Sequence, residues 1–114
     1  MTDIPKQTLS ELINNIKTKK ISSEEATKAF IDRSEKSKKL NTYITESFDR
    51  AIKKAKQFDQ NPNFDLKLPG IPIAVKDLFC TKDVKTTAGS KILNNFIPTY
   101  ESTVTQNIWN EGAI

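Results

Sequence analysis

Residues 68–80 have the sequence LPGIPIAVKDLFC, in which an apolar run, Ile71–Val75, lies between a glycine and two charged residues. The run is too short for a helix, and its aliphatic side chains are typical of a strand that is buried on both faces. Pro72 lies near the start of the run, where a missing N–H group is tolerated. We therefore predict a buried strand over Ile71–Val75.

The sequence before this run predicts a helical region over residues 1–60. Two capping boxes, each a hydroxyl residue followed three positions later by glutamate, mark two helix starts: Thr8 with Glu11, and Ser22 with Glu25. Apolar residues at helical spacing follow each box, so we expect a first helix that ends near Lys19 and a second that ends within residues 34–39. A third apolar stripe predicts a helix from Phe48 to about Phe58.

The remaining segments are shorter or more polar. Residues 43–44 predict a short β-rich piece between the second and third helices. Residues 59–65 hold turn formers and a proline, which predicts a loop. Beyond the apolar run, the polar residues Thr81–Ser90 predict a longer loop. After Pro98, apolar residues at helical spacing predict a helix from Glu101 or Ser102 onward, which Gly112 closes at its C-terminal cap.

Ala113 and Ile114 predict the beginning of a further strand, because small and β-branched residues after a helix are typical of alternating α/β proteins. Together these elements predict an α/β fold with a mixed sheet flanked by helices. A helical first half, residues 1–60, is followed by a strand, a loop and a helix in residues 66–114. The strands are too few to complete a sheet, so we interpret residues 1–114 as a fragment of a single domain.

The composition excludes several classes of protein. With 114 residues, 36% of them apolar and 28% charged, the chain has room for one small soluble domain with a lean core. It has neither a bilayer-spanning apolar run nor a signal peptide, so we expect a cytoplasmic protein without a membrane partner. One cysteine and no histidine leave no ordinary zinc site. The net charge of +4 comes from lysines interleaved with acidic residues, which indicates a solvated surface rather than a specific nucleic-acid site.

Lys76 is the main candidate for chemistry because it follows the apolar run directly. If the strand is central, Lys76 lies at its carboxyl end, where α/β proteins place their sites. Burial without a partner disfavours a charged amine, and a neutral lysine could act as a base. The alternative is that Lys76 emerges into water beside Asp77 and has no chemical role. The residues alone leave both interpretations open.

Two neighbours of Lys76 have simpler interpretations. Asp77 points to the opposite face of an extended chain, so we expect it to cap a turn rather than to pair with Lys76. Cys80 has no histidine to help form its thiolate. We therefore expect Cys80 to be a small buried apolar side chain.

The hydroxyl residues of the predicted loop also have a structural interpretation. Thr86, Thr87 and Ser90 lie near Gly89, but the loop lacks the pattern of a phosphate-binding turn. We expect them to make hydrogen bonds within the loop. Trp109 lies at helical spacing with other apolar residues, which predicts a core or interface position.

Three strings resemble the amidase signature family: GIPIAVKD at residues 70–77, TKDVKTTAGSKIL at 81–93 and NNFIPTYESTVTQ at 94–106. They occur in the family's order and spacing, and the N-terminal helices resemble the family's opening more loosely. The likeness covers nearly all of the chain and implies the N-terminal portion of an amidase-signature fold. Asp83 departs from the pattern, because it stands where the family often has glycine. If the position needs a positive φ, aspartate tolerates it at some cost.

The resemblance implies an amide hydrolase that uses two serines, one of them in a cis peptide, and a lysine. Lys76 matches the lysine, whose neutral amine would accept a proton through the bridging serine and so activate the nucleophilic serine. Both serines belong to a signature downstream of the residues present here, so Ser90 is not given that role. We expect residues 1–114 alone to be inactive, with Lys76 as their one catalytic residue.

Within the family, the likeness is to the A subunits of tRNA-dependent amidotransferases. This implies glutamine as the amide, B and C subunits as partners, and Glu-tRNA(Gln) bound mainly through the B subunit. No cofactor is implied for this chain, because ATP and magnesium are used by the partner subunit. Two alternatives stay open: a fragment of a general small-amide amidase, and a non-catalytic remnant that binds partner subunits or RNA.

Overall fold

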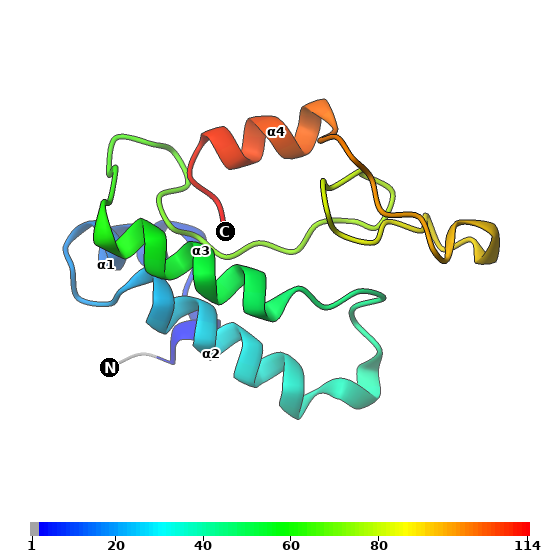
Figure 1. The fold of residues 1–114 in the computed structure, drawn as a ribbon. Coiled ribbons are helices and arrows are strands. Elements are labelled where there is room, and N and C mark those ends of the chain that lie inside the picture. The colour runs from blue at the N-terminus through cyan, green and yellow to red at the C-terminus, as the bar shows by residue number, and fades with distance from the viewer. Residues whose placement is uncertain (1–2) are drawn as a thin grey trace.

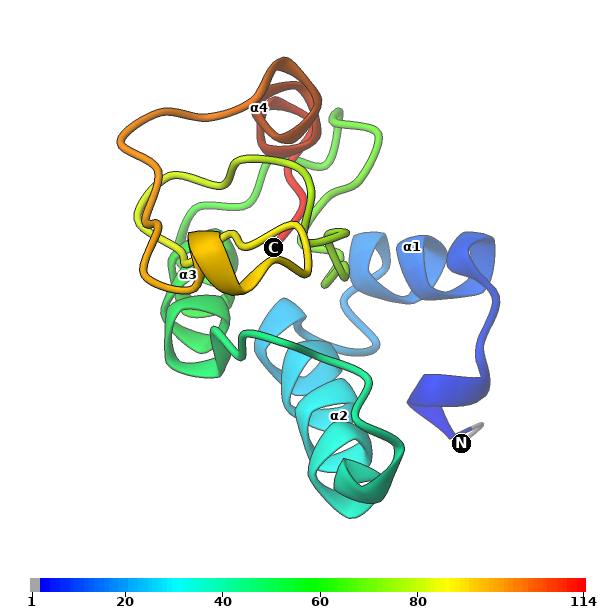
Figure 2. The same cartoon turned by 90° about the vertical axis from the view of Figure 1, so that its right-hand side faces the viewer.

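The computed structural model describes residues 3–114, which form four α-helices, three 3-10 turns and long irregular stretches (Figure 1). The α-helices are α1 (Leu9–Lys17), α2 (Ser23–Lys36), α3 (Phe48–Gln60) and α4 (Thr103–Asn110). The 3-10 turns cover Ile4–Lys6, Lys38–Leu40 and Lys91–Leu93. Figure 2 shows the four helices arranged around a central region that contains the C-terminus. The predicted helical first half is therefore confirmed, as is the helix before Gly112.

The first two helices start at the predicted capping boxes. The Thr8 hydroxyl accepts a hydrogen bond from the Glu11 amide at 3.3 Å, and the Glu11 carboxylate accepts one from the Thr8 amide at 2.8 Å. Ser22 and Glu25 exchange the same two bonds at 3.0 and 2.8 Å. Each pair satisfies amides that the first turn of a helix leaves without an intrahelical partner. Local sequence alone therefore fixes where both helices begin.

The buried apolar core lies mainly in the helical half. Its members are Leu12, Ile16, Ile21, Ala26 and Ile71. Partly buried side chains, among them Phe30, Phe58 and Phe64, pack against this cluster. One member of this cluster, Ile71, belongs to the second half of the chain, and it opens the apolar run over residues 71–75. Ala113 is also buried but lies outside the cluster.

The end of α3 completes the start of α2. The Asp59 carboxylate accepts hydrogen bonds from the amides of Ser23 and Glu24 at 2.8 and 2.9 Å, and the helix dipole favours an acid at this position. The Ser23 hydroxyl donates to the Gly70 carbonyl at 2.6 Å. Gly70 has a φ of 68°, and a Cβ atom there would lie 2.7 Å from the Phe58 ring. A side chain at residue 70 would therefore disrupt the junction between the two halves.

No strand is present within residues 3–114, so the predicted buried strand over Ile71–Val75 and the mixed sheet are not confirmed. Ile71 is buried, but Ala74 is exposed. A strand needs neighbours for its N–H and C=O groups. The described chain offers this run one neighbour, Ile114, whose amide donates to the Ile71 carbonyl at 2.8 Å and whose carbonyl accepts from the Ile73 amide at 3.0 Å.

These two bonds have the pattern of a parallel ladder. Ile114 bonds to Ile71 and Ile73, the two residues that flank its partner Pro72. α4 forms the crossover between the paired segments, as in a β-α-β unit. The strand predicted to begin at Ala113 and Ile114 is thus represented by one pair of ladder bonds.

The predicted β-rich piece at residues 43–44 is wrong. The segment lacks strand structure, and the side chains of Tyr43 and Ile44 are exposed. Tyr43 instead contacts Phe48 edge-on, with ring centres 6.3 Å apart. The physical reason is again the lack of a neighbouring strand, since β propensity needs a pleated surface to pack against.

Candidate functional site

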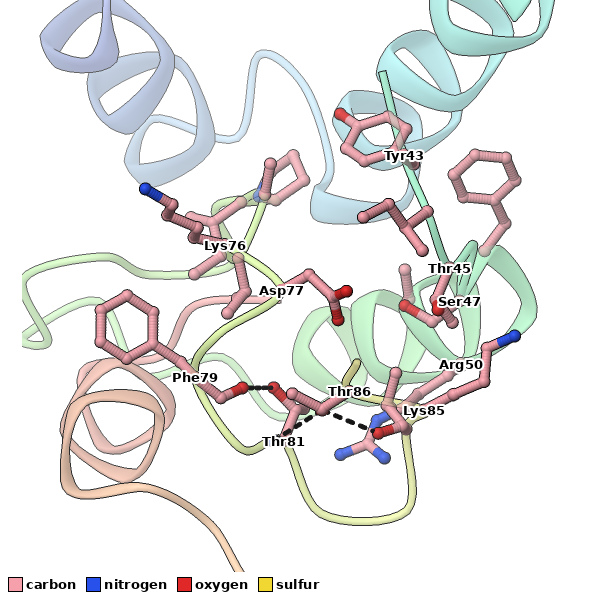
Figure 3. A pocket seen from close by; sticks show the side chains of 18 of the residues that line it. Tyr43, Thr45, Ser47, Arg50, Lys76, Asp77, Phe79, Thr81, Lys85 and Thr86 are labelled. Carbon is pink, nitrogen blue, oxygen red and sulfur yellow. Dashed lines mark hydrogen bonds between the residues drawn. The ribbon is translucent and has the colours of Figure 1, made fainter. Parts of the chain in front are cut away.

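A groove of about 820 Å³ is bounded by α2, α3 and the irregular chain over residues 72–88 (Figure 3). Its lining includes Phe30 and Phe48 from the helices, and Lys76 and Asp77 from the irregular chain. The residues that line it do not include any from α1. We take this groove as the candidate site because it combines an apolar lining with the lysine singled out by the sequence.

Lys76 lines the groove and is exposed to solvent. Its carbonyl accepts a hydrogen bond from the Phe79 amide at 3.0 Å, so a turn begins directly after the apolar run. In Figure 3 its amine and the Asp77 carboxylate point in different directions. Within residues 3–114 its side chain has no hydrogen bond or ion pair. Lys76 is therefore exposed to water in this chain, as in the alternative that gives it no chemical role. Its role as a base stays a prediction.

Asp77 closes the loop that follows it. Its carboxylate accepts hydrogen bonds from the Thr87 amide at 2.9 Å and from the Thr87 hydroxyl, and its carbonyl accepts one from the Ala88 amide at 2.8 Å. Burial raises the pKa of Asp77, but the bonds from Thr87 and the charge of Lys85 outweigh it and hold the pKa below its usual range. The predicted structural role of Asp77 is confirmed, but its carboxylate closes the loop on Thr87 rather than capping the turn at residues 76–79.

Hydroxyl groups hold the Thr81–Ser90 loop together, as predicted. The Thr86 hydroxyl donates to the Val84 carbonyl at 3.1 Å, and Thr86 is buried. Asp83 has a φ of 63°, and its amide donates to the Pro98 carbonyl at 2.9 Å. The position therefore needs the left-handed conformation that glycine adopts most easily, which aspartate tolerates at some cost.

A charged cluster beside the groove was missed by the sequence reasoning. Arg50 donates from Nη1 to the Lys82 carbonyl at 2.7 Å, and its Nη2 lies 3.9 Å from the Glu101 carboxylate. Lys54 Nζ lies 4.8 Å from the centre of the Trp109 ring. Burial and the charge of Arg50 lower the pKa of Lys54, and Glu101 acts in the opposite direction. In the sequence, these basic residues look like an ordinary solvated helix face.

Trp109 takes the packing position that the sequence predicted. Its ring lies between α4, which carries it, and the Lys54 amine of α3. A cation over an indole face is attracted by the ring quadrupole. Trp109 is half-buried and also lines the groove, so it joins α3 and α4 at an interface rather than in the main core.

Cys80 is only half-buried, so the prediction of a buried apolar side chain is wrong. Its Sγ lies 3.5 Å from the Tyr100 hydroxyl, and this hydrogen bond raises the pKa of Tyr100. The Cys80 carbonyl accepts bonds from the Ser102 amide at 2.8 Å and the Thr105 hydroxyl at 3.1 Å. Its main role is therefore to anchor the start of α4, and the irregular chain around it leaves the thiol partly open.

The described residues give Lys76 no nucleophilic partner. Within residues 3–114 no hydrogen bond joins its side chain to a serine. The same residues contain no group of three or more histidine, cysteine, aspartate or glutamate side chains placed to hold a metal ion. None of the helices described here has the length and apolar character to cross a bilayer. The arrangement offers a lysine, a closed loop and an apolar groove.

The model of the amidase family matches residues 25–114, which is most of the chain. The matched range contains Lys76, the loop closed by Asp77 and the whole of α4. The chain therefore belongs to the amidase family. The resemblance carried by the three strings in residues 70–106 is confirmed.

The chain is similar over its whole length to proteins named as the A subunit of glutamyl-tRNA(Gln) amidotransferase. It is 82% identical to the one from Pelagibacter ubique (strain HTCC1062), 48% identical to one from Rickettsia bellii (strain OSU 85-389), and 47% identical to one from Hyphomonas neptunium (strain ATCC 15444). Each match covers 100% of this chain and 24% of the relative. The chain thus spans about a quarter of the length of these curated relatives.

A solved structure shares this fold. It comes from a study of a vestigial protein complex and the evolutionary origins of an s-triazine catabolic enzyme. The likeness has a TM-score of 0.85 at 25% sequence identity and covers 95% of this chain and 25% of the solved chain. The arrangement of helices and irregular chain therefore recurs inside a much longer polypeptide.

Proposed function

We propose that this chain is the N-terminal part of the A subunit of a glutamyl-tRNA(Gln) amidotransferase. The 82% identity over all 114 residues to the Pelagibacter ubique protein carries the proposal. The full-length protein would hydrolyse glutamine and supply ammonia for the conversion of Glu-tRNA(Gln) to Gln-tRNA(Gln) in translation. A general small-amide amidase is not favoured, because the relatives from three genera carry the amidotransferase name.

Lys76 is the proposed base of this reaction. It lines the groove and ends the string GIPIAVK, which lies within the family match. In the proposed route, the neutral amine accepts a proton through a bridging serine in a cis peptide, and a second serine attacks the carboxamide carbon. The tetrahedral intermediate then releases ammonia and leaves an acyl-enzyme, which water hydrolyses to glutamate. Neither serine is assigned among residues 3–114, so residues 1–114 alone should release no ammonia.

The proposed assembly places this chain in a heterotrimer with B and C subunits. The B subunit would bind most of Glu-tRNA(Gln), and ATP and magnesium would act there rather than in the groove described above. The names of the relatives support a multisubunit amidotransferase, since each name describes one subunit of it. Co-purification of tagged residues 1–114, or of a longer chain that contains them, with B and C subunits would test this part.

Ammonia release from glutamine tests the catalytic part of the proposal. Residues 1–114 would be compared with the same residues joined to the downstream part of the Pelagibacter ubique protein. We expect release from the joined chain alone, and a loss of about 10²–10⁴-fold on Lys76→Ala. Lys17→Ala changes an exposed lysine of α1 that is remote from the groove lining and serves as the matched control.

Two outcomes would contradict this proposal. Release of ammonia by residues 1–114 alone would show that the downstream serines are not needed. Full activity of Lys76→Ala in the joined chain would remove Lys76 from the reaction. A preference for simple amides over glutamine would instead favour the small-amide amidase.

A further inference from the structure

The Arg50 side chain ties α3 to the loop that follows Lys76. Its Nη1 donates to the Lys82 carbonyl at 2.7 Å, and its Nη2 lies 3.9 Å from the carboxylate of Glu101, which precedes α4. A planar guanidinium presents its donors in a fixed fork, so one side chain can hold a carbonyl and a carboxylate together. Arg50, Lys82 and Glu101 thus form a tether between α3, the loop and the start of α4.

Glu101 can anchor this tether because its own side chain is fixed. The side chain is 13% exposed, and its carboxylate accepts a hydrogen bond from the Thr105 hydroxyl at 2.6 Å. Burial raises the pKa of Glu101, but hydrogen bonds, first that from Thr105, and the charge of Arg50 outweigh burial and lower the pKa. Loss of Arg50 would therefore deprive a largely buried carboxylate of a compensating charge.

Hydrogen bonds connect the tether to Lys76 along the loop (Figure 3). The Lys76 carbonyl accepts from the Phe79 amide at 3.0 Å, and the Phe79 carbonyl accepts from the Thr81 hydroxyl at 3.2 Å. Thr81 directly precedes Lys82, whose carbonyl Arg50 holds. A hydrogen bond or a covalent neighbour therefore makes every step from Lys76 to Arg50.

The position of Lys76 depends on the chain that follows it. Val75, which precedes it, makes no backbone hydrogen bond within the described residues. On the following side, the Asp77 carboxylate holds the Thr87 amide at 2.9 Å and closes the loop. The tether holds the middle of the same loop at Lys82. The two attachments together fix the path of the chain that leaves Lys76.

We propose that Arg50 and Glu101 are positioning residues for the reaction of Lys76. They hold residues 76–82 in place and so set the point from which the Lys76 amine acts, through the loop rather than through contact with the substrate. The inference rests on the proposed function and deepens it, because it gives a role to two residues outside the string that carries the base. The alternative is that the pair only stabilises the junction of α3 and α4.

Steady-state kinetics of the joined chain described above test the positioning role. Arg50→Met removes both contacts of the guanidinium and keeps a long side chain that suits a helix. We expect kcat for glutamine to fall about 10–100-fold, because a small displacement of a reacting group is costly, while KM stays within about twofold. Lys53→Met removes a charge from an exposed position of the same helix and is the matched control, with both constants within about twofold of the parent.

Two further variants separate positioning from a loss of folded protein, whose fraction circular dichroism measures. Arg50→Lys keeps a cation but not the fork, and lysine suits a helix as well as methionine does, so its kcat should lie between those of Arg50→Met and the parent. Glu101→Gln keeps the size of the side chain and removes its charge. Combined with Arg50→Met, it should lower kcat by no more than about twofold beyond the larger single loss, because the two residues act as one unit. Equal losses from Arg50→Lys and Arg50→Met, or losses that multiply in the double variant, would overturn the proposal.

Hydrogen exchange of the joined chain separates this inference from the proposed function. Peptides over residues 76–84 contain the bonded amides of Phe79, Asp83 and Val84, and peptides of α1 report on the helical region. Arg50→Met should speed exchange over residues 76–84 at least about threefold and leave α1 unchanged. Unchanged exchange there would overturn the tether whatever the activity, and faster exchange with an unchanged kcat would overturn the positioning role. Faster exchange in a joined chain that releases no ammonia from glutamine would support the tether and count against the glutaminase alone.

Discussion

The helical region, residues 3–60, and the irregular region, residues 66–114, satisfy their backbone groups in different ways. In the helical region, capping boxes and helix bonds join residues three or four positions apart. In the irregular region, bonds join distant positions, such as Gly70 with Gly112, and Val75 has no partner in the described chain. The comparison teaches that local sequence is enough to start and continue the helices, although Asp59 and Gly70 add distant bonds to the first turn of α2, whereas the extended run depends on neighbours.

Apolar side chains follow the same division. Leu12 and Ile16 are 4% and 2% exposed, whereas Ile92 and Ile97 are 95% and 56% exposed. Burial of one large aliphatic side chain contributes about 1.5–3 kcal/mol. The buried apolar residues of the helical region are Leu12, Ile16, Ile21, Ala26 and Ala55, against Ile71 and Ala113 in the irregular region, so apolar burial contributes more to stability in the helical region.

The largest expected effect is the loss of a core side chain from the helical region. Ile16→Ala should lower the free energy of unfolding by about 2–5 kcal/mol, because it leaves a cavity among buried neighbours. Ile92→Ala removes the same atoms from an exposed position and should change it by less than about 0.5 kcal/mol. Urea titrations of the two variants measure both values, and similar losses would contradict the division between the regions.

The next effect concerns the carboxylate that links α3 to α2. Asp59→Ala leaves the amides of Ser23 and Glu24 without their acceptor and should cost about 1–2 kcal/mol, as for other helix caps. Asp65→Ala removes an exposed carboxylate from the following loop and is the matched control. Thermal unfolding followed by circular dichroism compares them. Equal stability of the two variants would show that the Asp59 bonds contribute nothing.

A smaller, local effect is expected from acid. The pKa of Asp77 is lowered in the folded chain, so its bonds stabilise the loop above the unfolded-state pKa of about 3.9 and are lost as the pH falls through the lower folded value. Asp77→Asn should remove this acid sensitivity. Two-dimensional NMR of the Thr87 amide through the acid range would follow the loss, and an unchanged titration in Asp77→Asn would argue against the assignment.

The smallest effect is expected from an exposed ion pair of α2. Lys36 Nζ lies 2.7 Å from the Asp32 carboxylate, but the two side chains are 73% and 63% exposed. Lys36→Ala should change the free energy of unfolding by no more than about 0.5 kcal/mol, and less at high salt. A loss above about 1 kcal/mol in urea titrations would contradict this expectation. It would show that exposed ion pairs contribute to the stability of the helical region beside its buried apolar side chains.

The sequence predicted the helices well because their signals are local. Thr8 with Glu11 and Ser22 with Glu25 mark helix starts without reference to anything distant. The run Ile71–Val75 has strand-forming residues, but whether it becomes a strand depends on neighbours that its own sequence does not specify. The predicted strand is therefore not confirmed in this chain, while its pairing with Ile114 keeps the parallel direction typical of the predicted fold class.

The candidate site could be predicted only in part, because local sequence patterns reveal some of its residues and not the contacts between distant ones. Lys76 and Asp77 were found because they end a recognisable string, and Asp77 has a structural role as predicted, although its partner Thr87 lies ten residues away. The pairing of Arg50 with Glu101 joins residues that are far apart in sequence, and neither shows a distinctive spacing. Such a contact is set by the way α3 and α4 meet, which local patterns do not encode.

The bonds at the start of α2 have a consequence for the order in which the chain becomes structured during synthesis. A ribosome makes Ser23 long before it makes Asp59, which covers the amide of Ser23, and Gly70, which accepts its hydroxyl. The second helix can coil as soon as it emerges, but its first turn waits for those two later residues. Translation should therefore yield a loosely docked helix that becomes fixed once the glycine has left the exit tunnel.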